Sequence, residues 1–306
     1  MSLHLSRRAF LGAAGAALHA CASTQRRLAP GVFAADPRVG CYVSSPWGFR
    51  TSSYWIEGPT GLLLIDTQFL PSAAERALAA AQEATGKRAE LAVVLHANPD
   101  KYNGTGVYRG RGIRVVSARQ VVERIPEIDV ERRGFFAERY APDYPTALTL
   151  PESFGDASTS LHAGGVYVRA QVLGPGCSNA HVVLEFDGHV FPGDLIASRN
   201  HAWLKEANID AWLQRLEDLR ALNPRFVHPG RGPSGGPELI DQQEEYLRLV
   251  QRLVAEAHPT AQDDEAAQDR VRAAVEARYP GYGFAVFLRL GVPAEWRRQG
   301  ARAAQP

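Results

Sequence analysis

The stretch His96-Ala97-Asn98-Pro99-Asp100-Lys101-Tyr102-Asn103-Gly104 follows directly after the apolar run Leu91-Ala92-Val93-Val94-Leu95. A short unbroken apolar run predicts a strand that is buried on both faces. Polar residues that follow such a strand lie at the carboxyl edge of the sheet, where α/β proteins tend to place their sites. We therefore expect residues 96–104 to form the functional site.

Strand and helix patterns alternate on both sides of this stretch. Residues 54–57 and 62–66 predict a hairpin, and residues 72–85 predict a helix with Ser72 as its N-cap and Gly86 after its end. Residues 126–151 show no regular pattern and are expected to form a lid or an insertion. Further strands are expected at residues 113–116, 166–173, 181–186, 189–194 and 225–228, and further helices at 119–125, 209–222, 237–257 and 263–278. This order predicts an α/β fold.

The first thirty residues differ from the rest and divide the chain into residues 1–30 and a single domain of residues 31–306. Arg7-Arg8 and Phe10-Leu11 precede a short apolar run, which resembles a twin-arginine export signal and predicts a periplasmic location. The run ends in Leu18-His19-Ala20-Cys21, which resembles a lipoprotein cleavage box. The alternatives are a plain signal cut near Ala20 and a disordered basic N-terminus.

Composition limits the classes of partner. The chain has 34 basic and 33 acidic residues and a net charge of +1, so it carries no general attraction for nucleic acid. We expect a small-molecule partner, and contact with a membrane only through a lipid anchor at Cys21. Cys41 and Cys177 are expected either to pair in an oxidising compartment or to stay as buried thiols.

Polar or glycine residues follow apolar runs at several separate places. These are Ile65-Asp66-Thr67, His96 to Gly104, Gly176-Cys177-Ser178, Phe191-Pro192-Gly193-Asp194 and Pro229-Gly230-Arg231-Gly232. Their order and spacing resemble the metallo-β-lactamase fold superfamily across roughly residues 40–235. The resemblance implies a four-layer αββα sandwich with a metal site at one edge of its two sheets, and a hydrolase-like activity.

The resemblance also implies which residues would hold metal. His96, Asp100 and Asp194 match ligand positions of the family, and Cys177 stands where the family has a further histidine. These four residues are the expected metal set, and thiolate, imidazole and carboxylate groups all bind zinc. Asn98, Lys101 and Arg231 occupy positions where the family has histidines. Since protonated lysine and arginine cannot bind a cation, we expect at most one zinc ion.

Two kinds of function fit this site. In a hydrolase, Asp100, His96 and Cys177 are the expected catalytic residues, with either one metal ion or the Cys177 thiol as the reactive centre. In a non-catalytic binding protein, the donors of Asn98, Lys101, Asn103 and Arg231 would bind a small anion or a partner protein.

The same substitutions suggest how the site is held together without metal. Two buried aspartates without a counter-charge would be costly. Lys101 and Arg231 would bring the positive charge that Asp100 and Asp194 otherwise receive from metal ions. We therefore expect ion pairs between these cations and these carboxylates.

Overall fold

The structure is a computed structural model of the chain and describes residues 36–303. The proposed export signal in residues 1–30 and the proposed lipid site at Cys21 lie outside the described residues. No helix between residues 36 and 303 has both the length and the apolar character needed to cross a bilayer.

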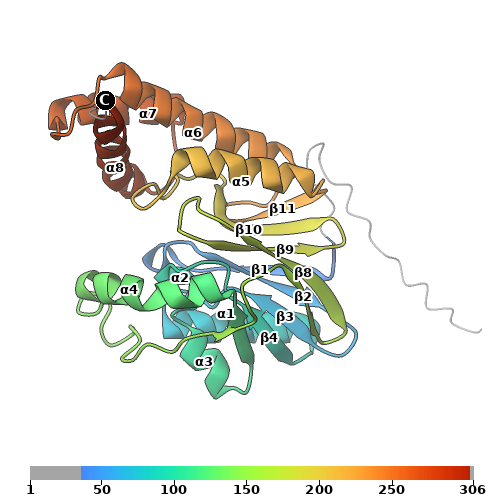
Figure 1. Cartoon of the computed structure of the whole chain (residues 1–306). Helices are drawn as coiled ribbons and strands as arrows, with labels where there is room; N and C mark the ends of the chain where they lie inside the picture. Colours follow the sequence, from blue (N-terminus) through green and yellow to red (C-terminus); the bar gives the residue numbers. More distant parts are fainter. Residues whose placement is uncertain (1–35, 304–306) are drawn as a thin grey trace, which may run out of the picture. The chain divides into compact units, whose positions relative to one another are not determined.

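Two mixed sheets form the centre of the described domain (Figure 1). The first has the order β1-β2-β3-β4-β5-β6 and the second the order β11-β10-β9-β8-β7. The first sheet contains β1 (Val39–Val43), β2 (Ser52–Glu57), β3 (Leu62–Ile65), β4 (Ala89–Val93), β5 (Arg114–Ser117) and β6 (Glu152–Ser153). The second contains β7 (Thr159–Ala163), β8 (Val166–Leu173), β9 (His181–Phe186), β10 (His189–Ala197) and β11 (Phe226–Arg231). The expected hairpin is confirmed, because β2 and β3 pair antiparallel.

Helices cover the outer face of each sheet (Figure 1). The first half of the chain supplies α1 (Pro71–Thr85), α2 (Pro99–Tyr102), α3 (Thr105–Gly110) and α4 (Arg119–Phe136), besides a short 3₁₀ turn at Pro46–Gly48. The second half supplies α5 (Ile209–Ala221), α6 (Glu238–Glu256), α7 (Glu265–Arg278) and α8 (Ala285–Ala303). This is the predicted α/β sandwich with four layers in the order αββα.

Two large apolar clusters fill the spaces between the layers. Ile56, Val93 and Val182 belong to a cluster that joins the two sheets. Trp212 and Leu247 belong to a second cluster beneath the helices of the C-terminal half. Burial of these apolar side chains is the main force that holds the layers together.

Several helices and strands differ from the sequence expectation. Helix α1 begins after Leu70, with Pro71 in its first turn, so Ser72 is not the N-cap and instead bonds Asp143. Helix α4 continues through Pro126 as far as Phe136, because Ile125 and Ile128 keep one face of the helix buried. Packing of this face outweighs the missing proline hydrogen bond. Strands β1, β6 and β7 and helices α2, α3 and α8 were not expected.

Candidate functional site

The expected loop is anchored to the neighbouring strand end by Asp66. Asp66 follows β3 and has a left-handed backbone, with φ 61°. Its Oδ1 accepts a hydrogen bond of 2.9 Å from the backbone N–H of Leu95, just before His96. Because β3 and β4 are parallel neighbours, this bond fixes the start of the loop against the sheet. Helix α2 then carries Asp100 and Lys101 toward the same edge.

Lys101 lies at the centre of a cluster of carboxylates and is fully buried. Its Nζ is 2.9 Å from Asp194 Oδ1, 3.1 Å from Asp100 Oδ2 and 3.8 Å from Asp66 Oδ2. Burial alone would lower the pKa of Lys101, but the three carboxylates outweigh it and hold the pKa above its usual value. Lys101 is therefore a permanent buried cation.

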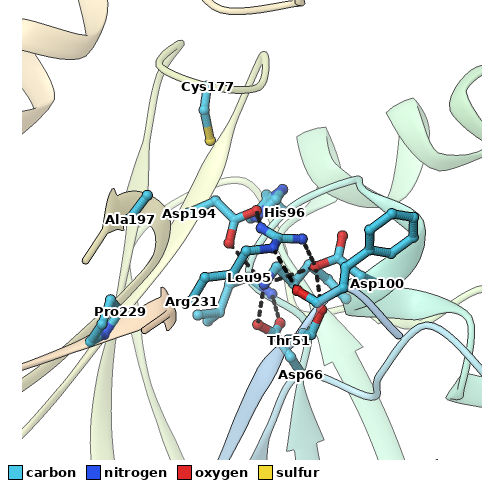
Figure 2. A network of polar contacts seen from close by, with 12 residues as sticks. Thr51, Asp66, Leu95, His96, Asp100, Cys177, Asp194, Ala197, Pro229 and Arg231 are labelled. Atoms are coloured by element: carbon cyan, nitrogen blue, oxygen red, sulfur yellow. Dashed lines mark hydrogen bonds and ion pairs between the residues drawn. The ribbon is translucent and has the colours of Figure 1, made fainter. Parts of the chain in front are cut away.

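Arg231 brings a second cation to the same carboxylates from the end of β11 (Figure 2). Its Nη2 donates to Asp100 Oδ2 at 2.6 Å, and its Nη1 donates to Asp194 Oδ2. Its Nε donates to the carbonyl oxygen of Phe49 at 3.3 Å, and Thr51 Oγ1 donates to Asp100 Oδ2 at 3.1 Å. The expected pairs between Lys101 or Arg231 and the two aspartates are all present. We call Asp100, Lys101, Asp194 and Arg231 the ion-pair network.

The ion-pair network is balanced in charge. Burial would raise the pKa of Asp194, but Arg231 and Lys101 hold it well below its usual range. Two carboxylates thus face two cations. Asp66 stands apart, because burial raises its pKa to about 7 even though Lys101 acts in the opposite direction. The network therefore has little positive charge left with which to attract a free anion.

The buried histidines next to the network are uncharged. His96 Nε2 is 3.6 Å from Asp194 Oδ2, and burial lowers the pKa of His96 to about 4. The His96 ring also lies 5.4 Å from the ring of His181, measured between centroids. His181 stands at no spacing typical of a metal ligand, so this neighbour of His96 was not expected.

Cys177 does not join the network. Its side chain is fully buried, and Figure 2 places it away from the Asp100 and Arg231 contacts. Its Sγ lies 3.9 Å from His181 Nε2, and burial raises its pKa well above the usual value. A neutral buried thiol is a poor nucleophile. Cys177 and Cys41 are both free, so they are not paired with each other.

The site does not fit a zinc ion. Within residues 36–303 no three or more His, Cys, Asp or Glu side chains are arranged to bind a metal. The expected metal set is not assembled, because Asp100 and Asp194 direct oxygens at Lys101 and Arg231 and because Cys177 faces His181. A guanidinium group cannot become a ligand, since it keeps its proton.

An aromatic pocket opens above the ion-pair network, and its cavity volume is about 60 Å³. Its rings come from Phe49, Phe69, Phe136, Trp203 and Phe287. Its polar lining comes from Asn98, Asp100, Arg132, Asp194 and Arg231. Sequence reasoning missed these rings and Arg132, because they belong to segments far apart in the chain.

The four expected ligand-binding residues have different places around this pocket. Asn98 and Arg231 line it, and Lys101 is buried among the carboxylates of the network. The side chain of Asn103 instead donates to the Phe69 carbonyl oxygen at 3.0 Å, which holds the loop rather than a ligand. Contacts of Asp100 with described residues are all on Oδ2, so its Oδ1 is available to a molecule in the pocket.

Acid is expected to destabilise the fold partly through His96. Its folded pKa of about 4 lies below the ordinary value of 6.5, so the unfolded chain binds more protons between these values. The stability that neutral His96 contributes is therefore fully present above pH 6.5, and it is lost as the pH falls toward 4. In urea unfolding between pH 7 and 5, His96→Gln should lose less stability than the wild type, by up to about 1.4 kcal/mol per pH unit. The exposed His162→Gln is the control, and an equal slope for both variants would contradict the prediction.

Comparisons with known proteins agree with this architecture. Residues 46–231 match the family model described as the metallo-beta-lactamase superfamily. A metallo-beta-lactamase from Pontibacter korlensis is 18% identical, with a TM-score of 0.55, and the match covers 71% of this chain and 97% of that one. The mono-zinc form of FIM-1 from Pseudomonas aeruginosa is 20% identical, with a TM-score of 0.54 and coverages of 72% and 96%. No curated protein matches the chain.

The family match spans well over half of the chain, including the hairpin, residues 96–104 and the end of β11. The solved structures share the fold at low sequence identity, so they support the architecture of this chain but no particular activity. The ordered motifs, the paired sheets and the family match agree, and the chain belongs to the metallo-β-lactamase superfamily.

Proposed function

We propose that this chain is an exported, metal-independent binding protein that keeps a hydrolase fold and uses its aromatic pocket to hold a small molecule. The observation that carries the proposal is the ion-pair network. Lys101 and Arg231 occupy both carboxylate oxygens of Asp194 and the Oδ2 of Asp100, which would otherwise be available to a metal ion. The two cations thus supply the positive charge that a metal would otherwise bring.

The chemistry of the pocket indicates the class of ligand. Five aromatic rings favour a flat, largely apolar molecule. The free Oδ1 of Asp100 would accept a hydrogen bond from that molecule. The side chain of Asn98, which has no hydrogen-bond partner among residues 36–303, offers both a donor and an acceptor. A neutral ring compound with a hydrogen-bond donor fits this pocket better than the small anion expected from the sequence, because the cations are already paired.

Metal content tests the proposal. We expect the full chain, purified without a histidine tag, to contain far less than one zinc per chain by elemental analysis. EDTA should leave its melting temperature unchanged, and the chromogenic cephalosporin nitrocefin should not be turned over with or without added zinc. Tightly bound zinc in stoichiometric amount, or turnover that depends on zinc, would contradict the proposal and would indicate a metal-dependent hydrolase.

Export is the second part of the proposal. Arg7-Arg8 with the apolar run that follows supports a twin-arginine route. Fractionation of expressing cells should recover the mature protein from the periplasm or its membrane face, and Arg7→Lys/Arg8→Lys should retain it in the cytoplasm. A wild-type protein found only in the cytoplasm would refute export and leave the binding proposal untouched.

A further inference from the structure

A second polar chain runs along the β10–β11 edge of the second sheet, where Tyr54 of the first sheet packs against it, and uses none of the residues of the ion-pair network. Ser234 Oγ lies 2.9 Å from His228 Nδ1, and His228 Nε2 lies 2.8 Å from His189 Nδ1. His189 Nε2 lies 3.3 Å from Asp36 Oδ2. Four side chains are thus connected end to end, from a serine hydroxyl through two imidazoles to a carboxylate.

The direction of the hydrogen bonds follows from the carboxylate. Asp36 can only accept, because Arg38 donates to it from its backbone N–H, Nε and Nη2 and holds its pKa well below the usual range. His189 must then donate from Nε2 and accept at Nδ1, so His228 donates from Nε2. This leaves His228 Nδ1 as an acceptor for the Ser234 hydroxyl. The opposite set of tautomers would place an unprotonated nitrogen of His189 against the carboxylate.

Packing holds both imidazoles in this arrangement and keeps them neutral. The Phe191 ring stacks on His228 with centroids 4.5 Å apart, and the Phe226 ring stacks on His189 at 4.6 Å. His189 is 1% exposed and His228 is 8% exposed, and burial lowers the pKa of His228 to about 3. Ser234, at the open end of the chain, is exposed. The reactive group can therefore be reached while the groups behind it are fixed.

The local sequence supports the same interpretation. Ser234 lies in Gly232-Pro233-Ser234-Gly235-Gly236, which connects β11 to α6. A serine between glycines at this spacing, in a turn from strand to helix, is the pattern of exposed nucleophilic serines. Gly232 has φ +87°, and a side chain there would lie 1.9 Å from the Ser198 carbonyl oxygen. The turn is longer than in that pattern, because Gly235 pairs with Val227 before α6 begins.

We propose that Ser234 is a nucleophile activated by His228, with His189 and Asp36 as positioning residues, and that it takes acyl groups from small activated esters. Ser234 Oγ would attack the ester carbonyl carbon while its proton moves to His228 Nδ1. The ester C–O bond then breaks, and His228 returns the proton to the departing alkoxide or phenoxide. Water releases the acyl group in a second, slower step that needs no other reactant.

This centre is separate from the pocket proposed above. His228 and Arg231 both belong to β11, and the register of β11 against β10 shifts between them. Their contacts differ, since Arg231 meets Asp100 and Asp194 whereas His228 meets His189, Ser234 and the Tyr54 ring. Either proposal can therefore fail without the other.

Acetylation by p-nitrophenyl acetate tests the proposal on the full chain. We expect a burst of one p-nitrophenolate per chain and an acetyl group on Ser234 by peptide mass spectrometry. Ser234→Ala should abolish both, whereas Ser160→Ala, at another exposed serine, should leave them unchanged. His228→Asn should slow the burst about 100-fold, the lower end of what a general base contributes.

The role of Asp36 has its own measurement. Asp36→Asn should lower the burst rate at saturating ester without changing the ester concentration for half-maximal rate, and Asp36→Glu should restore part of the rate. Circular dichroism would check that His228→Asn folds, and Ser234→Ala and Asp36→Asn decide the matter if it does not. A wild-type chain that forms no acetyl-Ser234, or a Ser234→Ala variant that keeps the burst, would overturn the proposal.

Discussion

Lys101→Met is expected to lower the free energy of unfolding by about 3–5 kcal/mol, the usual cost of removing one partner from a buried ion pair. Methionine fills a similar volume but carries no charge. Its introduction leaves Asp194 Oδ1 without the ammonium group that lies 2.9 Å away and leaves Asp100 with Arg231 as its remaining cation. Because Lys101 is fully buried, water cannot replace the lost charge.

Urea unfolding followed by circular dichroism measures this effect. Lys87→Met is the matched control, because Lys87 Nζ lies 2.6 Å from Glu57 Oε1 but both side chains are 29% exposed. That variant should lose less than about 1 kcal/mol. Adding Asp194→Asn to Lys101→Met should cost less than the sum of the single changes, since the two residues interact. Equal losses of unfolding free energy for the Lys101 and Lys87 variants would show that the buried network contributes no more stability than a partly exposed ion pair.

A zinc site is expected to appear when the three substituted positions are changed to histidine. Asn98→His/Lys101→His/Arg231→His removes both cations and places imidazoles beside Asp100 and Asp194, which are then free to bind metal. Nitrogen and carboxylate groups in this combination suit zinc. Free zinc at 100 times its dissociation constant should then stabilise the variant by about 2.7 kcal/mol. The wild type should show no such gain.

Zinc titration of EDTA-treated protein, with melting temperature and calorimetry as measurements, would decide this. Arg109→His/Arg169→His/Arg278→His is the control, because it adds three histidines at scattered exposed positions. This control distinguishes zinc binding at an assembled site from zinc binding by histidines anywhere on the surface. A triple variant in the site that gains no stability from zinc, whether folded or unfolded before addition, would contradict the prediction.

The sequence predicted the charged residues of the site better than it predicted the aromatic residues that line the pocket. Asp66, His96 and Asp100 follow the apolar strands β3 and β4, which end at a common edge of the first sheet, so their meeting could be inferred. Asp194 lies within β10 of the second sheet, and the resemblance to the family predicted its place beside them. Arg231 met the two aspartates for the same reason. Opposite charges buried together must pair, which is why the ion pairs were also predictable.

The pocket could not be predicted in this way. Phe136 lies on the part of α4 beyond Pro126, where the proline hid a helical spacing that Ile128 and Arg132 continue. Phe287 belongs to α8, which showed no strong period. Cys177 matched a ligand position by order alone, and its contact with His181 depends on how β9 begins. Side chains that meet through tertiary packing leave no local signal in the sequence.

The ion-pair network has a consequence for how the site can change by mutation. If Lys101 or Arg231 alone were replaced by histidine, one cation would disappear before a complete set of metal ligands existed. Each single replacement would thus lower stability without creating a metal site. Metal binding at this edge of the sheets is therefore accessible only through several simultaneous changes, because every intermediate chain would be less stable than the present one.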